Sequence, residues 1–215
     1  CLFFARAAVI VGRMEASYLT RHPRIKDLLN FTGFVLLVLV GTLLINTYIF
    51  RSFSVSGHSM DNTLSDGDRL IVDRLAVTAA LLKNKPYTPK RGQIIVFKNP
   101  RFVSNMRDEY IVKRVIAFPG ERVTVKDGVL TVYNDENPNG FEPDKGYRQG
   151  GVGPQSPSSG EVDTTVSEGM LFVAGDNRIG SNSYDSRTGL GLVPSHDVVG
   201  PVSVRLSPLT KITTF

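Results

Sequence analysis

One long uncharged run dominates the pattern of apolar and polar residues along the chain. No charged residue occurs from Leu28 to Phe50, and the stretch from Phe31 to Ile45 is almost wholly apolar. The run is about as long as a helix that crosses the hydrocarbon core of a bilayer, and it lacks the polar stripe of a core helix. A cleaved signal peptide would have a shorter apolar region and a small-residue cleavage site, which Ile-Phe-Arg at 49–51 does not provide. The pattern predicts a retained transmembrane helix over residues 28–50.

Charged residues beside this run predict its orientation. Basic residues on the N-terminal side favour an N-terminus inside and a C-terminal domain outside; here they are Arg21, Arg24 and Lys26. We therefore expect a short cytoplasmic segment over residues 1–27 and an extracytoplasmic domain over residues 51–215. Because the sequence opens with Cys1, Met14 is a candidate start of the natural chain.

Beyond the helix, short apolar or alternating stretches separated by turn residues predict a mainly β domain. The expected strands are 52–55, 70–72, 94–97, 110–117, 123–125, 129–133, 170–174 and 198–206. Residues 75–82 are apolar and rich in alanine, so they fit either a short surface-associated helix or a loop. Residues 134–168 are rich in Gly, Pro, Asp, Asn and Ser, which predicts a long, loop-rich excursion on the surface.

Composition excludes several classes of function. The net charge is +5, but residues 1–50 contribute +3, and the rest of the chain has no basic run with interleaved aromatic residues, so nucleic-acid binding is not expected. Cys1 is the only cysteine and the three histidines are scattered, which predicts neither an intrachain disulfide nor a metal site. We expect no cofactor. The sequence does not indicate an oligomeric state.

Ser59 is a candidate nucleophile. It follows the expected strand that ends at Val55 and lies between Gly57 and Gly67. Glycine tolerates positive φ, so both positions favour sharp bends, and a serine held between bends can expose its hydroxyl group. A polar loop behind a membrane anchor is the alternative for an isolated serine.

Lys113 is a candidate general base. It lies in the expected strand 110–117, on the same face as Ile111, Val115 and Ala117. Burial among such residues disfavours the charged ammonium and would lower the lysine pKa from about 10.4, as catalysis near neutral pH requires. The alternative is an edge strand whose lysine reaches water.

Two Asp/Arg pairs follow the expected strand 170–174. They are Asp176 with Arg178 and Asp185 with Arg187. Such clusters occur at functional sites and also as ion pairs that brace a loop, so the pattern alone leaves both interpretations open.

Five motifs together resemble the successive conserved boxes of bacterial type I signal peptidase. They are Ser-Gly-His-Ser-Met-Asp-Asn-Thr-Leu (56–64), Gly-Asp-Arg-Leu-Ile-Val (67–72), Arg-Gly-Gln-Ile-Ile-Val-Phe (91–97), Tyr-Ile-Val-Lys-Arg-Val-Ile (110–116) with Pro119-Gly120, and Gly-Asp-Asn-Arg (175–178) with Ser-Tyr-Asp-Ser-Arg (183–187). They occur in the family's order over about residues 51–205. The resemblance implies a folded β-sheet domain of the signal-peptidase and repressor-protease type, behind one transmembrane helix.

The resemblance also implies an activity. It is that of a serine endopeptidase in the cytoplasmic membrane, which removes signal peptides from exported preproteins after small residues at Ala-x-Ala sites. Its partners would be preprotein signal peptides and membrane lipid. Ser59 would be the nucleophile, Lys113 its general base, and the main-chain N–H of Ser59 a donor to the oxyanion.

Further residues receive roles by the same resemblance. Ser183 would orient the lysine amine, and the other supporting residues would be Asp185, Arg187, Asp176 and Arg178. Shallow pockets for small substrate residues would be lined by Phe53, Val55, Ile111 and Val112. The substrate would bind beside these strands as an added strand.

The chain departs from the family pattern at three places. Gly57 stands where some members carry a second oxyanion serine, which Ser56 could replace. Asn62 stands in place of the usual proline before Thr-Leu. The segment 179–182 is longer than common, which makes Ser181 the alternative to Ser183.

Three other functions are weighed against this one. A self-cleaving Ser–Lys protease of the repressor type would be soluble and carry a DNA-binding helix-turn-helix, which the apolar run argues against. A Ser–His signal peptidase would need histidine in place of Lys113. A membrane-anchored protein that binds signal peptides without cutting them is compatible with the sequence, although the intact Ser59 and Lys113 argue against it.

Overall fold

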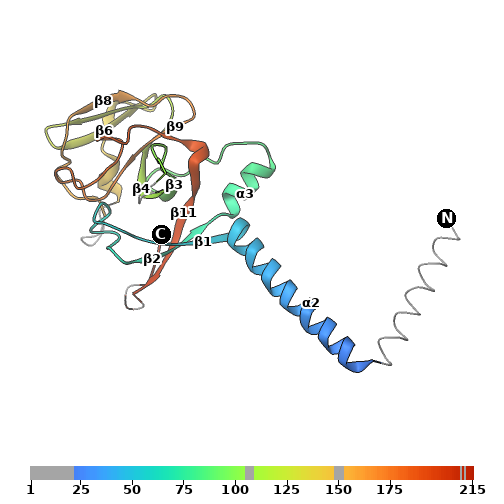
Figure 1. Ribbon diagram of the computed structural model, residues 1–215. Helices are drawn as coiled ribbons and strands as arrows, with labels where there is room; N and C mark the ends of the chain where they lie inside the picture. The colour runs from blue at the N-terminus through green and yellow to red at the C-terminus, as the bar shows by residue number, and fades with distance from the viewer. Residues whose placement is uncertain (1–21, 105–108, 148–152, 209, 211) are drawn as a thin grey trace, which may run out of the picture. The chain divides into compact units, whose positions relative to one another are not determined.

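The computed structural model describes residues 22–104, 109–147, 153–208, 210 and 212–215 (Figure 1). It contains a helical unit that ends at Asn46 and a β unit from Thr47 to Phe215. Most of the expected cytoplasmic segment, including Arg21 and the candidate start Met14, lies outside the described residues.

The helical unit is the apolar run. Helix α2 (Pro23–Leu44) has no buried residue and continues into one π-helical turn, η1 (Ile45–Ile49). By length and composition, the span Pro23–Ile49 can cross a membrane. The helix begins earlier than the expected residue 28, because Pro23 fits a first helical turn, where the missing N–H has no helical partner to lose. Phe50, the last residue of the expected span, pairs with Asp73 in a strand.

Twelve strands in the described residues form two antiparallel sheets (Figure 1). The larger sheet has the order β1-β2-β11-β3-β4-β9-β10, with β12 on β11. Its strands are β1 (Phe50–Ser54), β2 (Arg69–Asp73), β3 (Ile94–Lys98), β4 (Tyr110–Ala117), β9 (Met170–Ala174), β10 (Val193–Pro194), β11 (Val198–Ser207) and β12 (Thr213–Thr214). The smaller sheet has the order β7-β6-β5-β8. Its strands are β5 (Arg122–Lys126), β6 (Val129–Asn134), β7 (Asn137–Phe141) and β8 (Val162–Thr165). The mainly β prediction is therefore confirmed.

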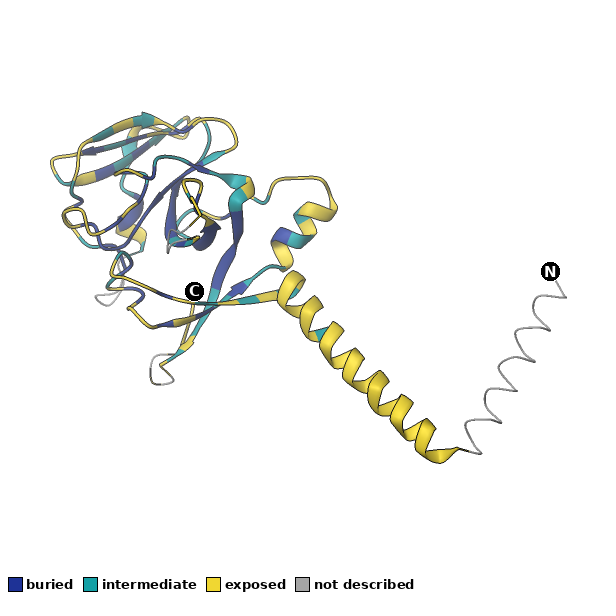
Figure 2. Cartoon of the chain, viewed as in Figure 1, coloured by how far each residue is buried: buried dark blue, intermediate teal, exposed yellow. Residues whose placement is uncertain are grey.

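The central strands of the larger sheet are buried (Figure 2), and apolar side chains pack on both of their faces. On β3, Ile94 and Val96 belong to one buried cluster, whereas Ile95 and Phe97 belong to another. A third cluster joins the two sheets: it combines residues of β4 and β9, such as Phe172, with residues of β5 and β6. Burial on both faces explains why β3 is a continuous apolar run instead of an alternating one.

Several expectations about local structure are now decided. Residues 75–82 form a helix, α3 (Leu75–Leu82), and not a loop. The segment 134–168 is more ordered than expected: it contains β7, β8 and the short 3₁₀ helix η2 (Pro143–Gly146). A second 3₁₀ helix, η3 (Ser195–Asp197), precedes β11.

The expected face of β4 is partly wrong. Ile111 and Val115 lie in one cluster, but Ala117 lies in the cluster between the sheets. The pairing of β4 with β9 shifts register between Val115 and Ala117, and such a bulge turns the following side chains to the other face.

Phe172→Ala tests the junction between the sheets. Phe172 is fully buried, so its truncation should cost about 3–5 kcal/mol of unfolding free energy. Chemical denaturation of the full chain in detergent measures this loss. Phe215→Ala is the control, because that ring is 45% exposed and should cost far less. Equal losses in the two variants would contradict this account of the core.

Candidate active site

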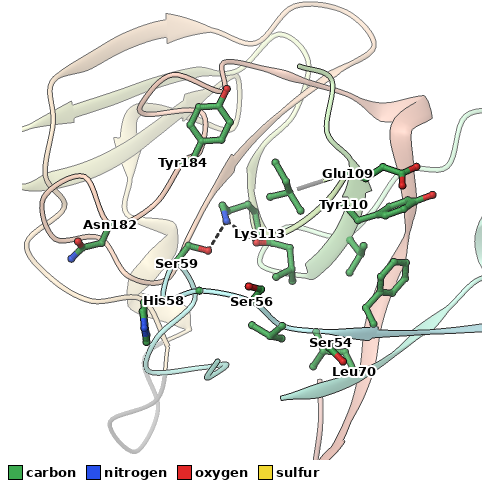
Figure 3. Close-up of a pocket in the computed structure, with 16 residues that line it drawn as sticks. Ser54, Ser56, His58, Ser59, Leu70, Glu109, Tyr110, Lys113, Asn182 and Tyr184 are labelled. Carbon is green, nitrogen blue, oxygen red and sulfur yellow. Dashed lines mark hydrogen bonds between the residues drawn. The ribbon is translucent and has the colours of Figure 1, made fainter. Parts of the chain in front are cut away.

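A pocket of about 490 Å³ brings most of the expected site residues together (Figure 3). Ser59 and Lys113 line it, as do the four expected substrate-binding residues, Phe53, Val55, Ile111 and Val112. Phe53 lies on β1, Val55 and Ser59 lie in the loop that follows it, and the other three residues lie on the first half of β4. Asn182 and Tyr184 line the pocket from the loop that follows β9.

The loop between β1 and β2 holds Ser59 at this pocket. The next residue, Met60, is 1% exposed and packs in the core together with Leu64, which fixes the loop on both sides of a short turn. Gly57 has a φ of +92°, as its place at a bend requires, and its N–H donates to Asp66 Oδ1 at 2.7 Å. Asn62 has a φ of +80°, a conformation that proline cannot adopt. The departure from the family pattern at this position therefore has a structural reason.

Lys113 is buried beside Ser59. Its Nζ lies 2.7 Å from Ser59 Oγ and donates to the carbonyl oxygen of Val112 at 2.9 Å, and the residue is 3% exposed. β4 lies between β3 and β9 in the sheet. Because the Lys113 side chain is buried, the alternative of a lysine that reaches water is wrong.

Ser183 belongs to a buried group beside Ser59. Its Oγ donates to Asp185 Oδ2 at 2.6 Å, and Asp185 also accepts from Gly175 N–H and from Arg187. Asp185 and Arg187 thus form the expected ion pair. A Cβ on Gly175 would lie 2.2 Å from Ser183 Oγ and 2.3 Å from Ser59 O, so only glycine fits between the two serines. Ser181, the alternative to Ser183, is exposed.

The electrostatic state of Asp185 follows from these contacts. Burial by itself would raise the pKa of this carboxyl, but hydrogen bonds from Arg187, Ser183 and Gly175 N–H, together with the charge of Arg187, leave the pKa below its ordinary value. The site therefore contains a carboxylate that stays ionised, although it is almost completely buried.

The other expected supporting residues do not pair with each other. Asp176 accepts from Arg114 Nε at 2.8 Å, from Arg114 Nη2 at 2.5 Å and from Thr63 Oγ1 at 2.5 Å. Arg178 pairs instead with Asp144 of η2, and both residues are buried. The short sequence distance between Asp176 and Arg178 was misleading, because their side chains leave the chain in different directions toward distant partners.

The residues at the site to which the sequence assigned no role include Thr63, Asp144, Gly175 and Asn177. Asn177 contacts the main chain of His58 and Ser59. Thr63, Gly175 and Asn177 lie within the quoted motifs, and this position is the feature of the sequence that could have identified them as site residues. Asp144 lies in a polar turn of the 134–168 segment, and nothing in the sequence separates it from other turn residues. In the described part of the chain, no group of three His, Cys, Asp or Glu side chains could hold a metal ion.

Asp185→Asn tests the buried carboxylate through pH. Because its pKa is lowered below the unfolded value of about 3.9, ionised Asp185 stabilises the fold above about pH 4, and this contribution is lost as the pH falls through the folded-state value. The variant leaves Arg187 buried without its partner and should lose about 3–5 kcal/mol at pH 7. The gap in unfolding midpoint between wild type and variant should shrink below about pH 4.

The matched control for this experiment is Asp163→Asn. Asp163 pairs with Arg122 at the surface, where both side chains are more than half exposed. Thermal unfolding of the full chain in detergent should show little change for this variant at any pH. A gap for Asp185→Asn that stayed constant down to about pH 2 would contradict the lowered pKa.

Comparisons with known proteins give the family. A model described as signal peptidase, peptidase S26, matches residues 26–207. Signal peptidase I of Bacillus licheniformis is 31% identical over 194 residues, which cover 86% of this chain and 92% of that protein. Signal peptidase IB of Staphylococcus aureus is 29% identical over 199 residues, with 86% of this chain and 93% of that protein covered. A crystal structure of a signal peptidase I from Enterococcus faecalis V583 is 30% identical, covers 54% of this chain and 97% of its own, and gives a TM-score of 0.37. The chain therefore belongs to the signal peptidase family, peptidase S26, and is a serine-type hydrolase of that family.

Proposed function

We propose that this chain is a membrane-bound endopeptidase that removes signal peptides from exported preproteins with Ser59 and Lys113. The observation that supports this proposal is the distance of 2.7 Å between Lys113 Nζ and Ser59 Oγ in a pocket that is open to solvent. Burial disfavours the charged ammonium, so the amine can accept a proton, and a serine beside a base is an activated nucleophile.

The reaction proceeds in two stages. Ser59 Oγ bonds to the scissile carbonyl carbon while its proton passes to Lys113 Nζ, and the carbonyl electron pair moves to the oxygen. The C–N bond then breaks, the leaving amine takes the proton from Lys113, and the signal peptide remains as an ester on Ser59. Water attacks this ester and gives its proton to Lys113, which returns the proton to Ser59 Oγ as the free carboxyl end leaves.

The unpaired edge of β4 at the pocket is compatible with an extended substrate. β9 pairs with β4 only at Arg114, Val115 and Ala117, so the half of β4 from Tyr110 to Lys113 has no strand partner on that side among the described residues. An extended peptide can pair with this open edge. The apolar side chains of Phe53, Val55, Ile111 and Val112 would then surround the small residues before the cut.

The membrane has a role in this proposal. Substrate and enzyme meet at the bilayer when the span Pro23–Ile49 is inserted. We propose a single-pass topology in the cytoplasmic membrane with the N-terminus inside, because Arg24 and Lys26 precede the apolar part of the span. Ser183 would orient the Lys113 amine, since it lies behind the nucleophile and is itself fixed by Asp185.

Ser59→Ala and Lys113→Ala test the mechanism. Each should reduce cleavage of a preprotein with an Ala-x-Ala site by at least about 10²–10⁴-fold, because the nucleophile or its base is lost. Cleavage by the full chain in detergent or liposomes is followed as a shift on a gel. Lys126→Ala is the control, since that lysine is exposed on β5 in the smaller sheet and does not line the pocket.

Other outcomes distinguish the competing functions. Activity that survives in Lys113→Ala would mean that another group is the base. A wild type that binds the preprotein without cutting it would favour the non-cleaving binding protein. Cleavage of the chain itself, with none of the preprotein, would favour a self-cleaving protease.

Gly175→Ala tests the fit between the two serines. A methyl group at this position would lie within 2.3 Å of Ser183 Oγ and Ser59 O, so the nucleophile must shift. A displacement of about 1 Å can cost about 10²-fold in rate, and we expect a loss of that size in the cleavage assay. Gly146→Ala is the control, because nothing lies within 4 Å of its added Cβ. Full activity of Gly175→Ala would show that the nucleophile does not need its present position.

A further inference from the structure

Asn177 holds the main chain on both sides of Ser59. Its side-chain Nδ2 donates to the carbonyl oxygen of His58 at 2.9 Å, and its main-chain N–H donates to the carbonyl oxygen of Ser59 at 3.1 Å. Asn177 is 6% exposed, and its Oδ1 accepts from Asn182 Nδ2 at 3.5 Å. This second contact keeps the donor end of the amide turned toward His58.

The contact with His58 determines the direction of a neighbouring donor. In a planar trans peptide, the C=O and N–H groups point in opposite directions. The cis bonds in the described residues are Ser156-Pro157 and Ser207-Pro208, so the peptide between His58 and Ser59 is trans. Whatever fixes the carbonyl oxygen of His58 therefore also fixes the N–H of Ser59 on the opposite side of that peptide.

The N–H of Ser59 is available to a ligand. It makes no hydrogen bond to any residue that the structure describes, and Ser59 lines the pocket. The nearby N–H of Gly57 is already bound to Asp66. The direction of the Ser59 N–H is therefore the property that decides whether this loop can stabilise negative charge in the pocket.

We propose that Asn177 is a positioning residue that aims the Ser59 N–H at the oxygen of the scissile carbonyl. This inference rests on the proposed function, because the N–H meets an oxyanion only if Ser59 attacks a carbonyl group. Asp61 N–H also donates to His58 O, at 3.2 Å, but Asp61 belongs to the same turn and rotates with it. The Asn177 contact comes from a segment 119 residues away, so it does not rotate with the turn.

The residue before Asn177 connects it to the strand that carries Lys113. The preceding residue, Asp176, is bound by two nitrogens of Arg114 on β4, and Arg114 is the neighbour of Lys113. Asn177 therefore relates the direction of the oxyanion donor to the strand that carries the base. A rotation of the peptide at Ser59 would break the Asn177 contact, while the distance from Lys113 to the serine could remain unchanged.

Two variants separate this role from a general structural one. Asn177→Ala removes the side-chain donor and keeps the main-chain contact with Ser59. Asn177→Leu keeps about the same volume in this buried position but offers neither an N–H to the carbonyl oxygen of His58 nor a charge, so it serves where the smaller alanine side chain leaves a cavity. Asn137→Ala is the control, because that asparagine is exposed on β7 in the second sheet.

The experiment combines kinetics with two inhibitors on the full chain in detergent. Both Asn177 variants should lower kcat for a preprotein about 10–10²-fold and change KM by less than about twofold. A peptide aldehyde ending in Ala-x-alaninal forms a bond to Ser59 Oγ and places an oxyanion in the pocket, so its inhibition should weaken by the same factor as kcat. The corresponding peptide alcohol has no such oxygen, and its inhibition should stay within about twofold of wild type.

Results against the role of Asn177 can be told apart from results against the proposed function. An unchanged kcat, or equal weakening of the aldehyde and the alcohol, would overturn the role of Asn177 while cleavage still depended on Ser59. A wild type that does not cleave, or a Ser59→Ala variant that does, would overturn the proposed function and this inference with it.

Discussion

The geometry of the site depends on the buried carboxylate of Asp176. Its two oxygens accept hydrogen bonds from Arg114 on β4 and from Thr63 on the loop that carries Ser59. Three segments that are distant in sequence therefore meet at one side chain that is not exposed at all. Hydrogen bonds to an ionised group are short and directional, unlike an apolar contact of the same area. The carboxylate thus sets the spacing between the loop of Ser59 and the strand of Lys113.

Two further buried ion pairs surround the same segment, and each immobilises a different part of it. Arg178 binds Asp144 and so attaches the segment to η2, whereas Arg187 binds Asp185 and so supports Ser183. Removal of such charges from water is costly, and a buried pair often adds little net stability over an apolar substitute. These pairs instead fix one arrangement of the segments around them. A carboxylate that accepts several hydrogen bonds is satisfied only when every donor is in its place. Such an arrangement keeps Lys113 Nζ and Ser59 Oγ within hydrogen-bond distance of each other.

The sequence allowed the general architecture to be predicted but not the network. The apolar run, the strands and the helix-or-loop segment 75–82 have local patterns, and the motifs placed Ser59 and Lys113 in register with a known family. The partners of Asp176 and Arg178 could not be predicted, since ion pairs depend on tertiary contacts and sequence proximity suggested the wrong ones. The order within residues 134–168 was missed because β7 has the sequence Asn-Pro-Asn-Gly-Phe, which by composition is typical of a turn.

One irregularity in β4 explains how a single strand serves both the pocket and the core. Before the register shift at Val115, the strand has an open edge, and Lys113 lies on it between side chains of the pocket. After the shift, Ile116 and Ala117 pack between the two sheets. A regular strand would keep a strict alternation of faces, so Ala117 would point to the same side as Lys113 and would be lost from the junction. The bulge therefore allows the same eight residues to present a lysine to the pocket and to fasten the second sheet.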